Sequence, residues 1–326
     1  MNQLTTFNLT YKPFAFPWAM EIASKHEDIH WTEKEADLQD DVTQWNNGTL
    51  TQGEKNHITQ ILRLFTTSDV QVGGNYCDFF IPYFRNNELR NMLLAFAARE
   101  GIHQRAYALL NETLGLDDSE FSAFLEFEEM ADKAAFSGTN SAETPKDMAL
   151  SLVKSVINEG LCLFSAFAQL LTYKRSGKML GMSKIVEWSI RDETEHVNGM
   201  ARLFREFVKA YPEVLTEDFK KAAYDMFREA VALEDRFIDL CYEQGEPPKL
   251  SKEELKAYIR YIADRRLVAL GFKPNWELKE NPSPWIEEIL GDQLTNFFEQ
   301  RVSDYSVGNL TGEWVYPDVK KGVLLA

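Results

Sequence analysis

Cysteine is scarce in this sequence. Only three occur among 326 residues, Cys77, Cys162 and Cys241, and no two of them form a C-x-x-C pair. An odd number of widely spaced cysteines gives no disulfide framework, and each of the three lies in or beside an apolar stretch. We therefore expect reduced cysteines in the core of a cytosolic protein.

Four other features are missing. The net charge is −16 and no Lys/Arg cluster is dense, which argues against nucleic-acid binding. The N-terminus lacks a basic segment followed by an apolar one, so no signal peptide is expected. The least polar long run, 160–173, is too short to span a bilayer and predicts a buried helix rather than a membrane segment. No Gly-rich phosphate loop occurs, so we expect no nucleotide site in this chain.

The alternation of apolar and polar residues that marks a strand is also absent, and helix starts are frequent instead. Capping boxes occur at Thr51 to Glu54 and at Ser251 to Glu254, and Thr144-Pro145 places a cap residue before a proline. With the Gly and Pro breaks, these signals predict helices over 51–84, 88–114, a short segment after 119, 145–175, 183–210, 216–244 and 251–271.

The motif Glu-x-x-His occurs twice, at Glu100 to His103 and at Glu193 to His196. Residues three apart share a helix face, so each motif projects one carboxylate and one imidazole in the same direction. Such a pair on each of two helices, with one carboxylate from each of two others, is typical of the di-metal site of ferritin-like bundles.

Asp69 and Glu159 are the candidates for the two remaining carboxylates. Both lie in mid-helix among apolar residues, where a lone charge is costly. Four carboxylates balance two divalent cations, and oxygen and nitrogen ligands without thiolate suit iron or manganese better than structural zinc. The other histidines, His26, His30 and His57, have no such partners, and we expect them at the surface.

We therefore predict an all-α protein with a ferritin-like helical bundle and a di-metal carboxylate site in its core. Residues 1–50 form an irregular segment with a short helix near Trp18–Lys25, and 51–272 form the bundle. Residues 273–305 form an irregular segment that completes the domain, and 306–326 form a flexible tail, because glycines and few apolar residues favour mobility there.

Tyr107 follows Glu100 by seven residues, nearly two helical turns, and should point into the bundle beside the metals. Leu163 and Phe167 follow Glu159 at helical spacing and would form an apolar stripe on a neighbouring helix. A phenol beside an oxidising metal pair could lose an electron, and the surrounding apolar side chains would shield the resulting radical. The alternative is an ordinary core tyrosine with a bonded hydroxyl.

At this point the sequence resembles the small, radical-generating subunit of class I ribonucleotide reductase, over about 28–310. An Asp at 69 is followed by Glu-x-x-His-x-x-x-Tyr over 100–107, a lone Glu at 159 and Arg-Asp-Glu-x-x-His over 191–196. The segments 281–285 and 297–305 resemble the family's C-terminal pieces.

The resemblance implies a metal-binding role for each of the six residues. One ion would take Asp69, Glu100 and His103, and the other Glu159, Glu193 and His196, with some carboxylates bridging. It implies two metal ions per chain, with di-iron favoured and di-manganese or a mixed pair left open, because ligand type does not separate these metals.

Four further residues match roles in radical transfer. Tyr107 matches the radical tyrosine, and Asp192 matches an acid that orients the His103 imidazole. Trp31 matches the tryptophan that relays the radical outward, and Tyr305 the tail tyrosine that passes it to the large subunit. Outside the family, Asp192 would be an ion-paired surface residue and Trp31 a buried aromatic.

One position departs from the family. Ser189, four residues before Glu193, stands where the family often has an apolar side chain near the radical. A hydroxyl there changes the surroundings of Tyr107, so it stays open whether Tyr107 holds a stable radical.

The resemblance also implies the reaction and the partners. Oxidised metals take an electron from Tyr107, and the hole passes through Trp31 and Tyr305 to a cysteine of the large, catalytic subunit, which reduces ribonucleotides to deoxyribonucleotides. The small subunit would be a cytoplasmic homodimer that binds the large subunit through its tail. The alternatives are a stand-alone di-metal oxidase or oxygenase, which commonly has Glu in place of Asp69 and needs a substrate pocket, and a metal-storage protein.

Overall fold

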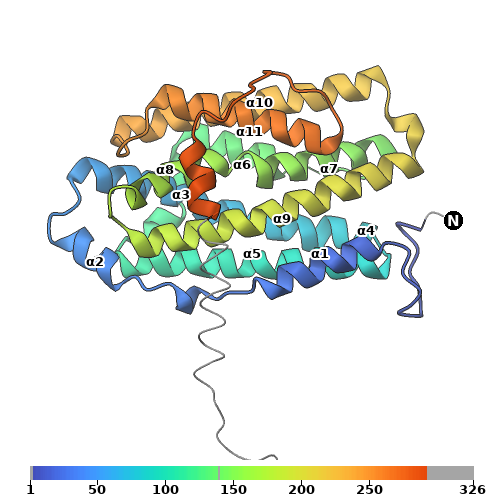
Figure 1. Ribbon diagram of the computed structural model, residues 1–326, viewed down its shortest axis with the longest axis horizontal. Coiled ribbons are helices and arrows are strands. Elements are labelled where there is room, and N and C mark those ends of the chain that lie inside the picture. The colour runs from blue at the N-terminus through green and yellow to red at the C-terminus, as the bar shows by residue number, and fades with distance from the viewer. Residues whose placement is uncertain (1–2, 139, 292–326) are drawn as a thin grey trace, which may run out of the picture. The chain divides into compact units, whose positions relative to one another are not determined.

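The computed structural model describes residues 3–138 and 140–291, and within them no strand occurs. Residues up to Ile286 form one compact unit of packed helices (Figure 1). The prediction of an all-α bundle is confirmed. The α-helices are α1 (Pro17–Asp28), α2 (Gln39–Asn46), α3 (Gln52–Gly74), α4 (Ile81–Tyr83), α5 (Asn87–Thr113), α6 (Glu128–Gly138), α7 (Pro145–Gly160), α8 (Phe164–Lys174), α9 (Leu180–Ala210), α10 (Glu217–Gln244) and α11 (Lys252–Leu270).

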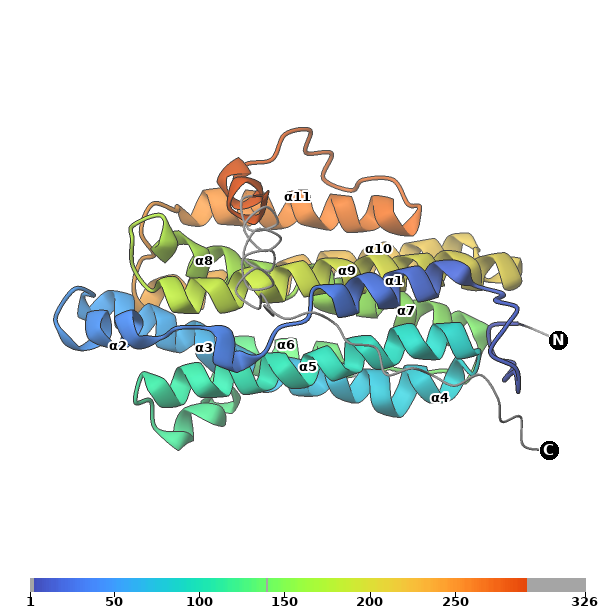
Figure 2. The same cartoon turned by 60° about the horizontal axis from the view of Figure 1, so that its bottom comes forward.

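The long helices lie side by side and enclose an aromatic core. Helix α5 packs on α3 and α1, and α9 packs on α7, α8 and α5 (Figures 1 and 2). Helices α10 and α11 pack against each other and contact α7. The pairs α3/α5 and α7/α9 are the packed helices that carry the Glu-x-x-His motifs and the two lone carboxylates.

Helix starts follow the expected chemistry with one correction. Thr51 and Glu54 form a complete capping box, and so do Thr144 and Asp147. At Ser251 only the hydroxyl caps the helix, by accepting from the amide of Glu254. The Glu254 carboxylate instead accepts hydrogen bonds from the Ser283 hydroxyl at 2.7 Å and from the Trp285 indole at 3.1 Å.

Three predicted segments differ in the structure. The 51–84 helix changes at Asn75–Phe80 into a π-helix, a feature frequent at functional sites. The 145–175 helix breaks at Leu161, whose φ and ψ are −137° and −53°. Residues 1–50 contain α2 as well as α1, so this segment is more ordered than predicted.

The last carbonyl of α7 is satisfied by a distant arginine. The Arg266 guanidinium donates from Nε to the carbonyl of Gly160 at 2.9 Å. A Cβ at position 160 would lie 2.7 Å from that Nε, so glycine is required for the approach. Arg266 thus satisfies a carbonyl at the end of α7, where helix carbonyls lack partners.

The burial of the apolar segment, the cysteines and the histidines agrees only in part with the predictions. One stretch, Pro145–Lys174, is long and apolar enough to cross a membrane, but 89% of its most apolar window is buried, so it is a core segment. Cys162 and Cys241 are buried as expected, whereas Cys77 is exposed. His30 is exposed, but the surface prediction is wrong for His26 and His57, which are buried.

Candidate metal centre

The six candidate ligands come from four helices and meet in the core. Helix α3 supplies one carboxylate, α7 another, and α5 and α9 each supply a carboxylate and an imidazole, all at most 1% exposed. Their donor atoms form two groups that share Glu100 and in which all atoms lie within 4.8 Å of one another. These groups are Asp69, Glu100 and His103, and Glu100, Glu159, Glu193 and His196.

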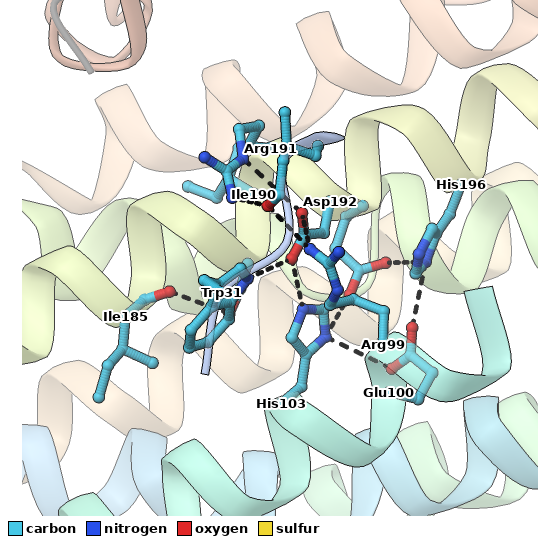
Figure 3. Close-up of polar contacts among 12 residues, drawn as sticks. Trp31, Arg99, Glu100, His103, Ile185, Ile190, Arg191, Asp192 and His196 are labelled. Carbon is cyan, nitrogen blue, oxygen red and sulfur yellow. Dashed lines mark hydrogen bonds and ion pairs between the residues drawn. The ribbon is translucent and has the colours of Figure 1, made fainter. Parts of the chain in front are cut away.

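Two carboxylates lie between the two imidazoles (Figure 3). Nδ1 of His103 is 3.5 Å from Oε2 of Glu100 and 3.3 Å from Oε1 of Glu193. Nδ1 of His196 is 3.1 Å from Oε1 of Glu100 and 3.3 Å from Oε2 of Glu193. Each carboxylate therefore turns one oxygen toward each imidazole.

The polar atoms of this cluster fit a pair of cations. Both oxygens of Glu100 and of Glu193, Oδ2 of Asp69 and Nδ1 of His103 are buried with no hydrogen-bond partner in the described chain. Buried polar atoms without partners are rare, because each costs about 1–3 kcal/mol. Electron-pair donors that converge in this way suit hard or borderline metal ions.

The charges lead to the same conclusion. Burial opposes the protonation of His103 and His196, yet the carboxylates around them raise the pKa of both imidazoles. Burial also raises the pKa of Asp69 well above its usual range. The protein alone thus balances its buried carboxylates with protons, and metal ions would displace those protons.

Asp192 joins the cluster to a tryptophan (Figure 3). Its Oδ2 lies 3.2 Å from Nε2 of His103 and accepts a 2.6 Å hydrogen bond from the Trp31 indole, while Oδ1 accepts from Arg99 at 2.8 Å. Burial would raise the pKa of Asp192, but the bond to His103 and the Arg99 charge hold it well below its usual range. Asp192 is therefore an anion, which fixes the His103 ring with Nδ1 facing the cluster.

This site can now be compared with known proteins. Residues 8–282 match the family described as "Ribonucleotide reductase, small chain". The chain belongs to the ribonucleotide reductase small-chain family. It is accordingly assigned to ribonucleoside-diphosphate reductase, an oxidoreductase, as its small subunit.

Individual similar proteins support this family assignment. A probable ribonucleoside-diphosphate reductase small subunit of Invertebrate iridescent virus 3 is 37% identical and covers 94% of this chain and 86% of its own. The crystal structure of a putative class I ribonucleotide reductase from Bacillus halodurans has a TM-score of 0.78 at 26% identity, over 84% of this chain and 99% of that one. A dimanganese(II) NrdF from Streptococcus sanguinis shares the fold, with a TM-score of 0.71 at 21% identity, over 83% of this chain and 94% of that one.

Within this small-chain fold, Trp31 is fully buried between two rings. Its ring centroid is 4.8 Å from that of Trp188 and 5.9 Å from that of His103, the latter nearly parallel at 29°. Lys184 lies over the other indole, 5.0 Å from the Trp188 centroid. The Trp31 ring is therefore enclosed between His103 and Trp188.

Tyr107 points into the core, as its spacing predicted. Its ring is stacked on Phe65 at 4.2 Å, and Phe65 on Phe167 at 5.3 Å. The Tyr107 hydroxyl donates to Oγ of Ser189 at 3.2 Å, and that hydroxyl donates to the carbonyl of Ile185 at 3.0 Å. Burial, reinforced by Asp69, raises the pKa of Tyr107 well above its usual range, so the phenol is protonated.

Two residues beside the cluster were not predicted. Tyr76 donates a 2.6 Å hydrogen bond to Oε2 of Glu159, and its place seven residues after Asp69 is a helical signal in the sequence.

His26, expected at the surface, has Nε2 only 3.4 Å from Nε2 of His196. Burial, with the neighbouring His196 and Arg99, lowers the pKa of His26 to about 2, so His26 is neutral beside that imidazole. Tyr305 lies outside the described residues.

Proposed function

We propose that the six buried residues hold two metal ions and that the chain assembles a di-metal and tyrosyl-radical centre. The ligand sets are those that the family resemblance implies. The facing of Glu100 and Glu193 toward both imidazoles supports bridging by these two carboxylates. When bound and reduced, such metals activate O₂ or a related oxidant and supply the oxidising power of the site.

Either iron or manganese fits the donors. Four carboxylates and two imidazoles offer only oxygen and nitrogen, which both metals accept. The solved structure from Streptococcus sanguinis is of a dimanganese(II) protein, whereas the family resemblance favours di-iron. We propose di-iron first, with di-manganese and a mixed pair as alternatives that metal analysis separates.

Tyr107 is the proposed radical site. Its hydroxyl donates to Oγ of Ser189 at 3.2 Å, which fixes the direction of the O–H bond. Because a serine hydroxyl is too weak a base to take the proton, the proton released as the ring loses an electron would pass to a carboxylate of the cluster, of which Asp69 acts most strongly on the phenol. The ring of Phe65 stacks on the phenol and is itself backed by Phe167, and Tyr107 is buried, so water is kept from the phenol. The Ser189 hydrogen bond gives this tyrosine a polar neighbour, so the lifetime of its radical is a property to be measured.

The observation that carries the proposal is the hydrogen-bonded path from His103 through Asp192 to Trp31. A stand-alone oxidase reacts at its own metals and needs no outward path, whereas a radical-donating subunit does. In this path Asp192 can accept the Trp31 indole proton at Oδ2 when the ring is oxidised. Tyr305, outside the described residues, would continue the path toward the large subunit.

The assembly is proposed on the same basis. We propose a homodimer, because the bundle leaves large apolar side chains exposed, among them Val70 on α3 and Leu94 on α5, at 55% and 51%. The tail over 306–326 would bind the large, catalytic subunit, and the protein would act in the cytoplasm, which cell fractionation tests.

The decisive experiment is turnover with and without the cognate large subunit. Metal-loaded protein should support reduction of ribonucleoside diphosphates only when that subunit is added. No turnover with the subunit, together with steady O₂ consumption on a small or lipid-like substrate in its absence, would favour the stand-alone oxidase.

A further inference from the structure

Glu159 differs from Glu100 and Glu193, the two carboxylates that lie between the imidazoles. Its Oε1 accepts a 2.7 Å hydrogen bond from Ser155, and its Oε2 accepts a 2.6 Å hydrogen bond from Tyr76. The oxygens of Glu100 and Glu193 have no such partners in the described chain. Two hydroxyl donors therefore hold the rotation of Glu159, whereas Glu100 and Glu193 face only the imidazoles.

Tyr76 reaches Glu159 because of its place on the chain. It lies seven residues after Asp69, at the start of the π-helix that continues α3, and is 1% exposed. Its ring packs on Phe96 at 5.9 Å and meets the edge of His196 at 6.0 Å and 80°. One face of this helix thus presents a carboxylate to one ligand group and a phenol to the other.

We propose that Tyr76, assisted by Ser155, is a positioning residue that holds Glu159 in a single orientation for the metal position beside His196. The proposal rests on the proposed di-metal function. Partners of this kind orient metal ligands, and their removal typically costs about 10–100-fold in metal affinity. A phenol donating to Oε2 also opposes chelation by both oxygens, because one lone pair of Oε2 is already engaged.

Titration of metal-free protein with Mn²⁺, followed by equilibrium dialysis, tests the role. Tyr76→Phe keeps the ring and removes only the hydroxyl. We expect one of two Mn²⁺ affinities to fall by about 10–100-fold, and the other to stay unchanged. The weakened position should be the one that His196→Ala eliminates. Ser155→Ala should lower the Mn²⁺ affinity of the same position. It tests the positioning of Glu159 independently if Tyr76→Phe fails to fold.

Tyr173→Phe is the matched control. It also removes a buried phenol hydroxyl, but one that lies 3.0 Å from His57 and away from the cluster. Its two Mn²⁺ affinities should equal those of the unchanged protein.

Three results would overturn the proposal. One is Mn²⁺ binding by Tyr76→Phe and Ser155→Ala equal to that of the unchanged protein. Another is an equal loss at both positions, which indicates a general structural effect. Binding of fewer than two Mn²⁺ by the unchanged protein would instead remove the di-metal function itself, and this inference with it.

Discussion

The indole nitrogen of Trp31 donates a 2.6 Å hydrogen bond to Oδ2 of Asp192, and that oxygen also lies 3.2 Å from the outer nitrogen of His103. Trp31 is fully buried, so this bond is shielded from water. Three side chains from distant parts of the sequence thus form one continuous path between the cluster and an oxidisable indole.

Trp31→Phe tests this path. Phenylalanine keeps an aromatic ring against Trp188 but has no N–H for Asp192 and is much harder to oxidise. Metal content and any Tyr107 radical should persist, while turnover with the large subunit falls to background. Trp188→Phe is the control, because it removes a neighbouring indole and leaves the bond to Asp192 in place. Normal turnover by Trp31→Phe would take this residue out of the pathway.

Tyr107→Phe tests the radical site. The phenol oxygen is not a proposed ligand, so the variant should bind as much metal as the unchanged protein and lose the tyrosyl signal in electron paramagnetic resonance. Ser189→Ala removes the 3.2 Å hydrogen bond to the phenol and should shift the spectrum and lifetime of that signal. Full turnover by Tyr107→Phe would mean that the metals store the oxidising equivalent.

His57 makes stability depend on pH. Burial lowers its pKa from 6.5 to about 4, so the folded state binds the proton less tightly than the unfolded state. The contribution of neutral His57 to the free energy of unfolding is complete above pH 6.5 and is lost as the pH falls toward 4. Between pH 7 and 5 the unchanged protein should lose about 2 kcal/mol more unfolding free energy than His57→Gln. Urea denaturation at both pH values measures this difference, and equal losses would show that His57 does not titrate in this range.

The tail and the dimer can be tested together. Light scattering should give a dimer mass, and a peptide of the last ~20 residues should compete for the large subunit, because tails that order on binding act in this way. Tyr305→Phe should keep the metals, the Tyr107 radical and subunit binding, yet stop turnover. A monomer at all concentrations, or binding unaffected by tail truncation, would contradict the proposed assembly.

The six cluster residues could be predicted from the sequence because each is marked by a local feature of a helix. Glu100 and His103 share a face at a spacing of three, and Asp69 and Glu159 lie among apolar residues where an unpaired charge is unfavourable. The structure brings these residues together in the core. Spacing along a helix and burial of charge are local properties, so a single sequence contains them.

The remaining features depend on contacts between distant segments. The Gly160 carbonyl at the break is bound by Arg266, which reaches it from a helix about a hundred residues later. The spacing of Tyr76 from Asp69 places both on one helix face, but which carboxylate Tyr76 meets depends on the packing of α7. His26 and His57 look like surface residues because the sequence does not show which helices cover them.

The central claim is that two redox-active metal ions lie between α3, α5, α7 and α9, and metal analysis of three proteins tests it most directly. The unchanged protein should hold close to two iron or manganese ions per chain. His103→Ala and His196→Ala, each of which removes one inward-facing imidazole, should each lose at least one of them. Full metal occupancy in both variants would contradict the account.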